Sequence, residues 1–111
     1  MLRIEKQGSV DVIRPRGPLR AELLEDARSA ARRLIRRGCP SVVVDLSQTL
    51  LLCGEALEWL LELDRECADR GGAVFIAAAS DLCSETLRIT GVGQRIQVFE
   101  DCTEAVGRFA T

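Results

Sequence analysis

The stretch from Ser41 to Leu63, SVVVDLSQTLLLCGEALEWLLEL, contains the pattern that decides the fold. Its three consecutive valines, Val42 to Val44, predict a strand that is buried on both faces, as in parallel sheets. From Glu55 to Arg70 apolar residues recur every three or four positions, which predicts a helix. The strand and the helix join at Cys53-Gly54, and functional sites often lie where a strand ends and a helix begins. What a site at Cys53-Gly54 could do depends on the fold and the chemistry that the other residues predict.

The residues before this stretch predict a hairpin and a helix. Leu2 and Ile4, then Val10 and Val12, alternate with polar residues around Gly8-Ser9, which is typical of two paired strands with a turn between them. A helix is predicted from Ala21 to Arg37, because its apolar residues fall on one face at a 3.6-residue spacing. These residues are Leu23, Leu24, Ala27, Ala31, Leu34 and Ile35.

The residues after the stretch continue the alternation of strands and helices. Residues 73–79 form an apolar strand in this interpretation, and residues 96–99 form the last strand. A helix over 80–90 is expected to bury Leu82, Leu87 and Ile89, with Ser80 or Asp81 as its cap. Asp101 or Thr103 would cap a final helix that ends near residue 109.

The predicted order is therefore β-β-α-β-α-β-α-β-α over one domain, residues 1–111. This order predicts an α/β fold, in which a mixed sheet opened by a β-hairpin has helices packed on it.

Composition excludes several classes of protein. Fifteen basic and seventeen acidic residues give a net charge of −2, which argues against a nucleic-acid partner despite the local run of arginines in residues 28–37. The chain has no histidine, so neither a Ser-His-Asp nor a Cys-His catalytic centre can be built from it alone. The five cysteines form no CxxC pair, and no signal peptide or membrane span is recognisable. We expect a cytoplasmic protein with reduced thiols, no cofactor and no metal site, and an enzyme is the least favoured class.

Several short motifs, in order and at consistent spacing, resemble the STAS domain family of sulfate transporters and anti-sigma factor antagonists. Val42 to Ser47 resembles the family's strand end "vvlDls", and Thr90-Gly91-Val92 its "tGl" turn. Gly17-Pro18-Leu19 and the ending from Val98 to Ala105 resemble further family motifs. The resemblance covers nearly the whole chain and implies the STAS fold.

The chain departs from this family at the family's functional motif. That motif, Asp-Ser-Ser/Thr-Gly at the start of the second helix, falls on Cys53 to Ala56, and none of the four residues agrees. In the regulated antagonists a partner anti-sigma factor kinase phosphorylates the first serine, and that position here is Gly54, which has no hydroxyl. Glu55 is either an ordinary first-turn acid or a fixed partial mimic of the phosphate.

The candidate partner-binding surface comprises the loop before the second helix and the outer face of that helix: Cys53, Gly54, Glu55, Glu58 and Trp59. The apolar stripe of this helix places Trp59 at the margin of the core or in solvent, as a boundary residue or as a binding anchor. Cys53 is either a small apolar residue or a redox-sensitive thiol at a helix start.

The resemblance implies a function in protein–protein binding. The leading hypothesis is a regulator like an anti-sigma factor antagonist, whose partner is an anti-sigma factor kinase. Alternatives are an accessory subunit of an ABC-type lipid transporter, with an ATPase as the partner, and a scaffold component of a signalling assembly.

Overall fold

The computed structural model describes residues 1–110 as five strands and five helices. The strands and helices are β1 (Leu2–Gln7), β2 (Val10–Pro15), α1 (Ala21–Ile35), β3 (Ser41–Asp45), α2 (Gly54–Asp69), β4 (Ala73–Ala77), α3 (Asp81–Thr90), α4 (Val92–Arg95), β5 (Val98–Phe99) and α5 (Cys102–Phe109). The predicted elements are all present, and the short helix α4 is added between α3 and β5.

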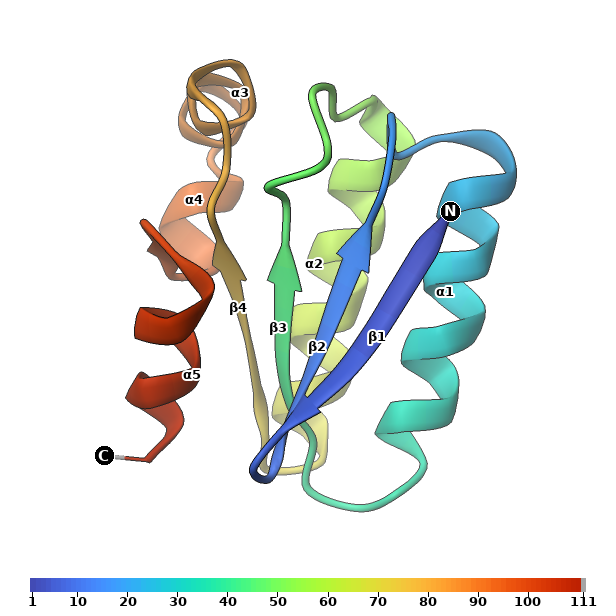
Figure 1. The fold of residues 1–111 in the computed structure, drawn as a ribbon, viewed down its shortest axis with the longest axis vertical. Helices are drawn as coiled ribbons and strands as arrows, with labels where there is room; N and C mark the ends of the chain where they lie inside the picture. The colour runs from blue at the N-terminus through green and yellow to red at the C-terminus, as the bar shows by residue number, and fades with distance from the viewer. Residues whose placement is uncertain (111) are drawn as a thin grey trace.

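The strands form one mixed sheet in the order β1-β2-β3-β4-β5. The opening hairpin pairs β1 and β2 antiparallel, whereas each later strand pairs parallel with its predecessor. Because each parallel neighbour is reached through a crossover helix, the carboxyl ends of β2, β3 and β4 lie together at the upper edge of the sheet in Figure 1. The predicted α/β fold with a hairpin and a mixed sheet is confirmed.

Helices cover both faces of the sheet. Helices α1 and α2 lie behind it in Figure 1, where they enclose the larger apolar cluster. Helix α5 closes a smaller cluster on the opposite face, which includes Val10, Val43 and Phe99. Strand β3 contributes to both clusters, because Val42 and Val44 point to one face and Val43 to the other. This explains the uninterrupted run of valines.

Helix α3 begins as predicted but buries a different set of side chains. Ser80 caps it, since its hydroxyl accepts a hydrogen bond from the Cys83 amide at 3.2 Å. The expectation that Leu82 and Ile89 are buried is wrong, because their exposed fractions are 55% and 70%. The helix lies beyond the end of β4 in Figure 1 and touches the core only through a narrow stripe, Cys83 and Leu87.

Candidate functional site

The candidate site lies at the edge of the sheet where β2, β3 and β4 end (Figure 1). The loop between β3 and α2, residues 46–53, crosses this edge and is bonded to its neighbours on both sides. The Gly17 amide donates to the Gln48 carbonyl at 2.9 Å, and the Leu46 amide donates to the Ala77 carbonyl at 2.9 Å. The hydroxyl of Thr49, a residue that is only 1% exposed, donates to the Pro15 carbonyl at 3.3 Å. The loop is therefore held in one shape by these contacts.

This anchoring leaves two leucines in solvent. Leu50 is 71% exposed and Leu51 is 51% exposed, although the residues around them are tied down. Helix α3 is joined to the same loop, because the Cys83 thiol donates to the Thr49 carbonyl at 3.4 Å, and Leu82 beside it is also exposed. We refer to Leu50, Leu51 and Leu82 as the apolar edge. Exposed large apolar side chains on an ordered loop are typical of binding surfaces.

Helix α2 begins directly after the apolar edge. Cys53 is its N-cap residue, and the thiol donates to the Leu19 carbonyl at 3.3 Å instead of capping the helix. Gly54 is exposed, and a Cβ placed on it would meet no atom within 4 Å. Glu55 and Glu58 are also exposed. The open space at Gly54 means that a side chain there would fit the fold.

A cleft of about 210 Å³ lies between this helix start and the loop after β2. Its walls come from both loops, and Leu19 and Leu52 form a parallel bridge within it. The lining residues are Pro18, Leu19, Arg20, Leu51, Leu52 and Cys53. The surface around the start of α2 is therefore hollowed as well as apolar.

The prediction that Trp59 lies at the core margin or in solvent is wrong. Trp59 is 3% exposed and belongs to the larger apolar cluster. Helix α1 lies against α2 here, and the Arg28 guanidinium contacts the Glu62 carboxylate at 3.2 Å. Helix α2 is thus buried on two sides, by the sheet and by α1, whereas the apolar stripe in the sequence indicated only the side toward the sheet. Trp59 therefore packs in the core beneath the candidate site and is not part of its surface.

Sequence reasoning missed Leu50 and Leu51 as site residues. The available signal was a run of three leucines, residues 50–52, in a segment already predicted to be a loop. Apolar residues in a loop need either burial or a partner, and their exposure could be known only once the loop's hydrogen bonds were seen.

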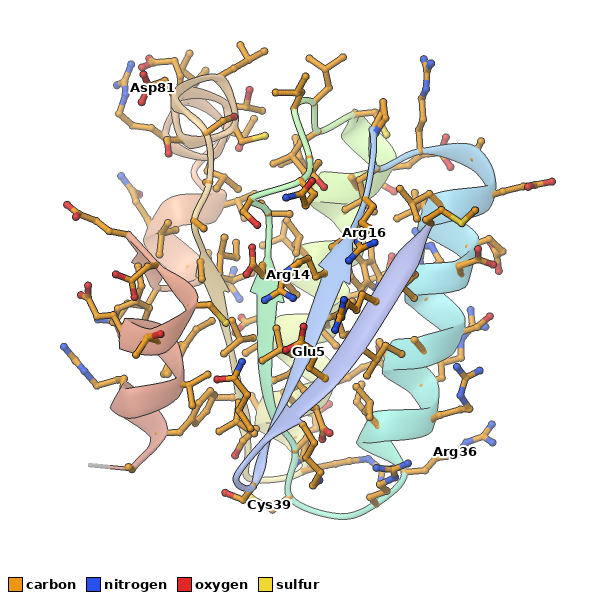
Figure 2. The ribbon with its side chains drawn as sticks, in the orientation of Figure 1. Glu5, Arg14, Arg16, Arg36, Cys39 and Asp81 are labelled. Carbon is orange, nitrogen blue, oxygen red and sulfur yellow. The ribbon has the colours of Figure 1, made fainter. Side chains whose placement is uncertain are left out.

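A charged cluster lies on the face of the sheet opposite α1 and α2, across β1, β2 and β3. Figure 2 shows Glu5 and Arg14 pointing toward each other, and Arg14 also contacts the Asp45 carboxylate at 3.0 Å. The hydrogen bond from Arg14 lowers the pKa of Glu5. Burial alone would lower the pKa of Arg14, but its hydrogen bonds to Glu5 and Asp45 outweigh burial and raise it. Asp45 also accepts a hydrogen bond from the Ser47 amide at 2.8 Å, so this cluster fixes the end of β3.

Two of the thiols are poor nucleophiles in this environment. Burial raises the pKa of Cys67 to about 12, and the charges of Asp64 and Glu66 add to the effect. Burial, followed by the charge of Asp45, raises the pKa of Cys102. Within residues 1–110 the acidic and thiol side chains form no group of three that could hold a metal ion. None of the described helices is long and apolar enough to cross a membrane.

Solved structures with this fold come from regulators and transporters. An anti-sigma factor antagonist (STAS) domain protein from Planctomyces limnophilus is 20% identical, with a TM-score of 0.86 over 99% of this chain and 98% of that one. An anti-sigma factor antagonist from Mycobacterium paratuberculosis is 16% identical, with a TM-score of 0.85 over 100% and 94% of the two chains. The STAS domain of a SulP transporter from Vibrio cholerae is 17% identical, with a TM-score of 0.73 over 87% and 77%. At these identities the likeness shows the fold.

No curated protein sequence matches the chain significantly. The sequence profile described as "Mlab, STAS domain" matches residues 2–100, which is most of the chain. The chain therefore belongs to the STAS domain family.

Proposed function

We propose that this protein is a non-enzymatic regulator like an anti-sigma factor antagonist, and that it binds its partner without phosphorylation at residue 54. One observation carries the proposal: Leu50 and Leu51 of the apolar edge are exposed on an anchored loop beside the position of the family's phosphoserine motif. The surface needs no modification to become accessible.

The energetics favour a protein partner. Burying one leucine side chain contributes about 1.5–3 kcal/mol, so the apolar edge supplies several kcal/mol when a partner covers it. The loop is already ordered, so binding loses little conformational entropy. Glu55 and Glu58 border the surface and favour a partner with basic side chains around an apolar centre.

The proposed contact surface comprises the apolar edge with Cys53, Gly54, Glu55 and Glu58. Trp59 is left out of direct contact because it is buried. In a switched relative, a phosphate would add about −1.5 to −2 charges at the start of α2 and repel an apolar or acidic partner. Gly54 has no hydroxyl that a kinase could phosphorylate, so the proposed contact surface is permanently able to bind its partner.

The missing hydroxyl at Gly54 also favours a second candidate, an accessory subunit of an ABC-type lipid transporter. A subunit docked on an ATPase needs no phosphorylation switch, and an ATPase partner could use the same apolar edge. The fold likeness to the STAS domain of a SulP transporter shows that domains of this fold also occur in transport proteins. A scaffold role in a larger assembly is the third candidate.

The test is affinity capture from native extract, with soluble and membrane fractions kept separate and partners identified by mass spectrometry. The double variant Leu50→Ser/Leu51→Ser should recover at least about tenfold less partner, since two apolar anchors are lost. Ile89→Ser is the matched control, because Ile89 is equally exposed but lies outside the apolar edge. A kinase-fold protein in the soluble fraction supports the regulator, and a membrane-associated ATPase supports the second candidate. Equal capture by the double variant and the wild type would show that the surface is wrong.

A further inference from the structure

Strand β1 is an edge of the sheet, and its outer side is regular. It pairs with β2 over all six residues, and the turn between them has two residues, Gly8 and Ser9. In such a hairpin the pair that closes the turn, Gln7 and Val10, is hydrogen-bonded, and bonded and non-bonded pairs alternate from there. The amides and carbonyls of Leu2, Ile4 and Lys6 therefore point away from β2.

Two observations agree with this assignment. Pro15 lies opposite Leu2, and a proline, which has no amide hydrogen, fits a pair that exchanges no hydrogen bonds. In residues 1–110, no backbone hydrogen bond outside the helices and the sheet involves Leu2, Ile4 or Lys6. The outer side of β1 thus presents a row of free backbone donors and acceptors, without a bulge or a proline to blunt it.

The side chains of β1 are complementary to those of a second β1 strand that runs antiparallel to it. Around Ile4 the sequence reads Arg3-Ile4-Glu5, with a positive residue on one side and a negative residue on the other. Ile4 is 41% exposed, which is high for an isoleucine in a strand. The Arg3 side chain is 56% exposed and already contacts Glu5 of its own strand at 3.0 Å.

We infer that β1 is the docking surface for β1 of a second copy of this chain, paired antiparallel about a two-fold axis at Ile4. In this register Ile4 faces Ile4, Arg3 faces Glu5 of the second copy, and Leu2 faces Lys6. The outward amides and carbonyls of Leu2, Ile4 and Lys6 form about six intermolecular hydrogen bonds. The two sheets become one continuous sheet.

Neighbouring registers are disfavoured by charge. A two-fold axis at Arg3 places two arginines opposite each other, an axis at Glu5 places two glutamates opposite each other, and an axis at Lys6 pairs two lysines. Like charges directly opposite across strands are destabilising. Of the axes at residues 3 to 6, the one at Ile4 is where every charge near the centre meets its opposite or an apolar residue.

Helix α1 carries charges that fit the same axis. Arg28 and Arg32 face α2, where they line a small cleft with Trp59. At about 100° per residue, Asp26 and Arg33 fall on the other side of α1, toward the β1 edge that α1 borders in Figure 1. A two-fold axis makes the two copies of α1 antiparallel, so the acidic start of one helix approaches the basic end of the other. The proposal does not rest on the proposed function, because the two surfaces use different residues.

The test is the mass of the chain by sedimentation equilibrium at about 100 µM, a concentration at which a dimer with a dissociation constant of about 10 µM is mostly formed. We expect a species of twice 12.2 kDa. Arg3→Glu should weaken the dimer at least about tenfold, because the carboxylate introduced at position 3 of each copy then repels Glu5 of the other. The double variant Arg3→Glu/Glu5→Arg should restore dimerisation, since it exchanges the two charges. Within one chain the introduced carboxylate lies opposite Arg14 of β2, so the fold is preserved.

Ile4→Pro is the second variant, because it removes an outward amide and leaves the hydrogen bonds to β2 intact. It should be a folded monomer, with the circular dichroism of the wild type. Leu50→Ser/Leu51→Ser is the control for the other surface and should stay dimeric. A wild type that is monomeric at this concentration would overturn the inference. So would a dimer that survives both Arg3→Glu and Ile4→Pro, which would place the contact elsewhere.

Discussion

Gly72 lies where the turn after α2 passes closest to another part of the backbone. A Cβ at this residue would come within 1.9 Å of the Pro40 carbonyl oxygen. Neither segment is free to move away, because the Gly72 amide donates to the Cys67 carbonyl at 2.8 Å and the Ala73 amide donates to the Pro40 carbonyl at 3.0 Å. We predict that Gly72→Ala lowers the free energy of unfolding by about 2–3 kcal/mol, as an overpacked site does. Urea unfolding followed by circular dichroism measures this loss.

Gly107→Ala is the matched control for that prediction. Gly107 is inside α5, and a Cβ there would meet no atom within 4 Å. Alanine should stabilise the helix by about 0.5–1 kcal/mol, since it has the higher helix propensity. Equal unfolding midpoints for Gly72→Ala and the wild type would mean that the backbone at Pro40 relaxes easily.

The residues of the site differ in how far the sequence could place them. The family motifs predict that Gly54 lies at the start of the second helix, and α2 begins at Gly54 in the structure. The exposure of Leu50 and Leu51 depends on hydrogen bonds to residues 15–19, more than thirty positions away in the chain. Such contacts leave no local pattern in a sequence.

Among the elements, α2 shows most clearly why a single apolar stripe is an incomplete guide. Periodicity correctly predicted that Leu60, Leu63 and Cys67 face the sheet. It could not show that α1 would cover the neighbouring side of α2, which buries Trp59. For helix α3, periodicity predicted too much burial. Leu82 and Ile89 are exposed, because α3 lies beyond the end of β4 and the sheet does not extend beneath these residues. Strands were predicted better, since buried valines leave few alternatives.

Helix α2 also provides a prediction that separates structural support from partner contact. Trp59→Ala should lower the free energy of unfolding by about 3–5 kcal/mol, the usual cost of deleting a buried aromatic side chain. Trp59→Phe should cost clearly less, because most of the volume is kept. Urea unfolding measures both values, and affinity capture of the folded Trp59→Phe variant should equal that of the wild type. A stable Trp59→Phe variant that loses its partner would show that the indole contacts the partner after all.

At the scale of the whole molecule, the two faces of the sheet share their strands. Strand β3 gives Val42 and Val44 to the cluster under α1 and α2, and Val43 to the cluster under α5. Helix α5 closes the second cluster with Phe109, whose ring stacks on Phe75 at 4.3 Å between centroids. Neither layer can lose its contacts with β3 without weakening the other. The structure therefore favours one cooperative unfolding transition.

Phe109→Ala tests this coupling across the sheet. The half-buried ring contributes about 1–2 kcal/mol, so the free energy of unfolding should fall by that amount. Trp59 fluorescence reports the opposite layer, and its urea midpoint should shift as far as the midpoint from circular dichroism. If α5 instead unfolds on its own, its amides will lose protection from hydrogen exchange while the Trp59 midpoint stays unchanged. If the two midpoints shift together, the helices on both faces of the sheet stabilise the shared strands. The loop with Leu50 and Leu51 follows strand β3, so both layers then also stabilise the apolar edge.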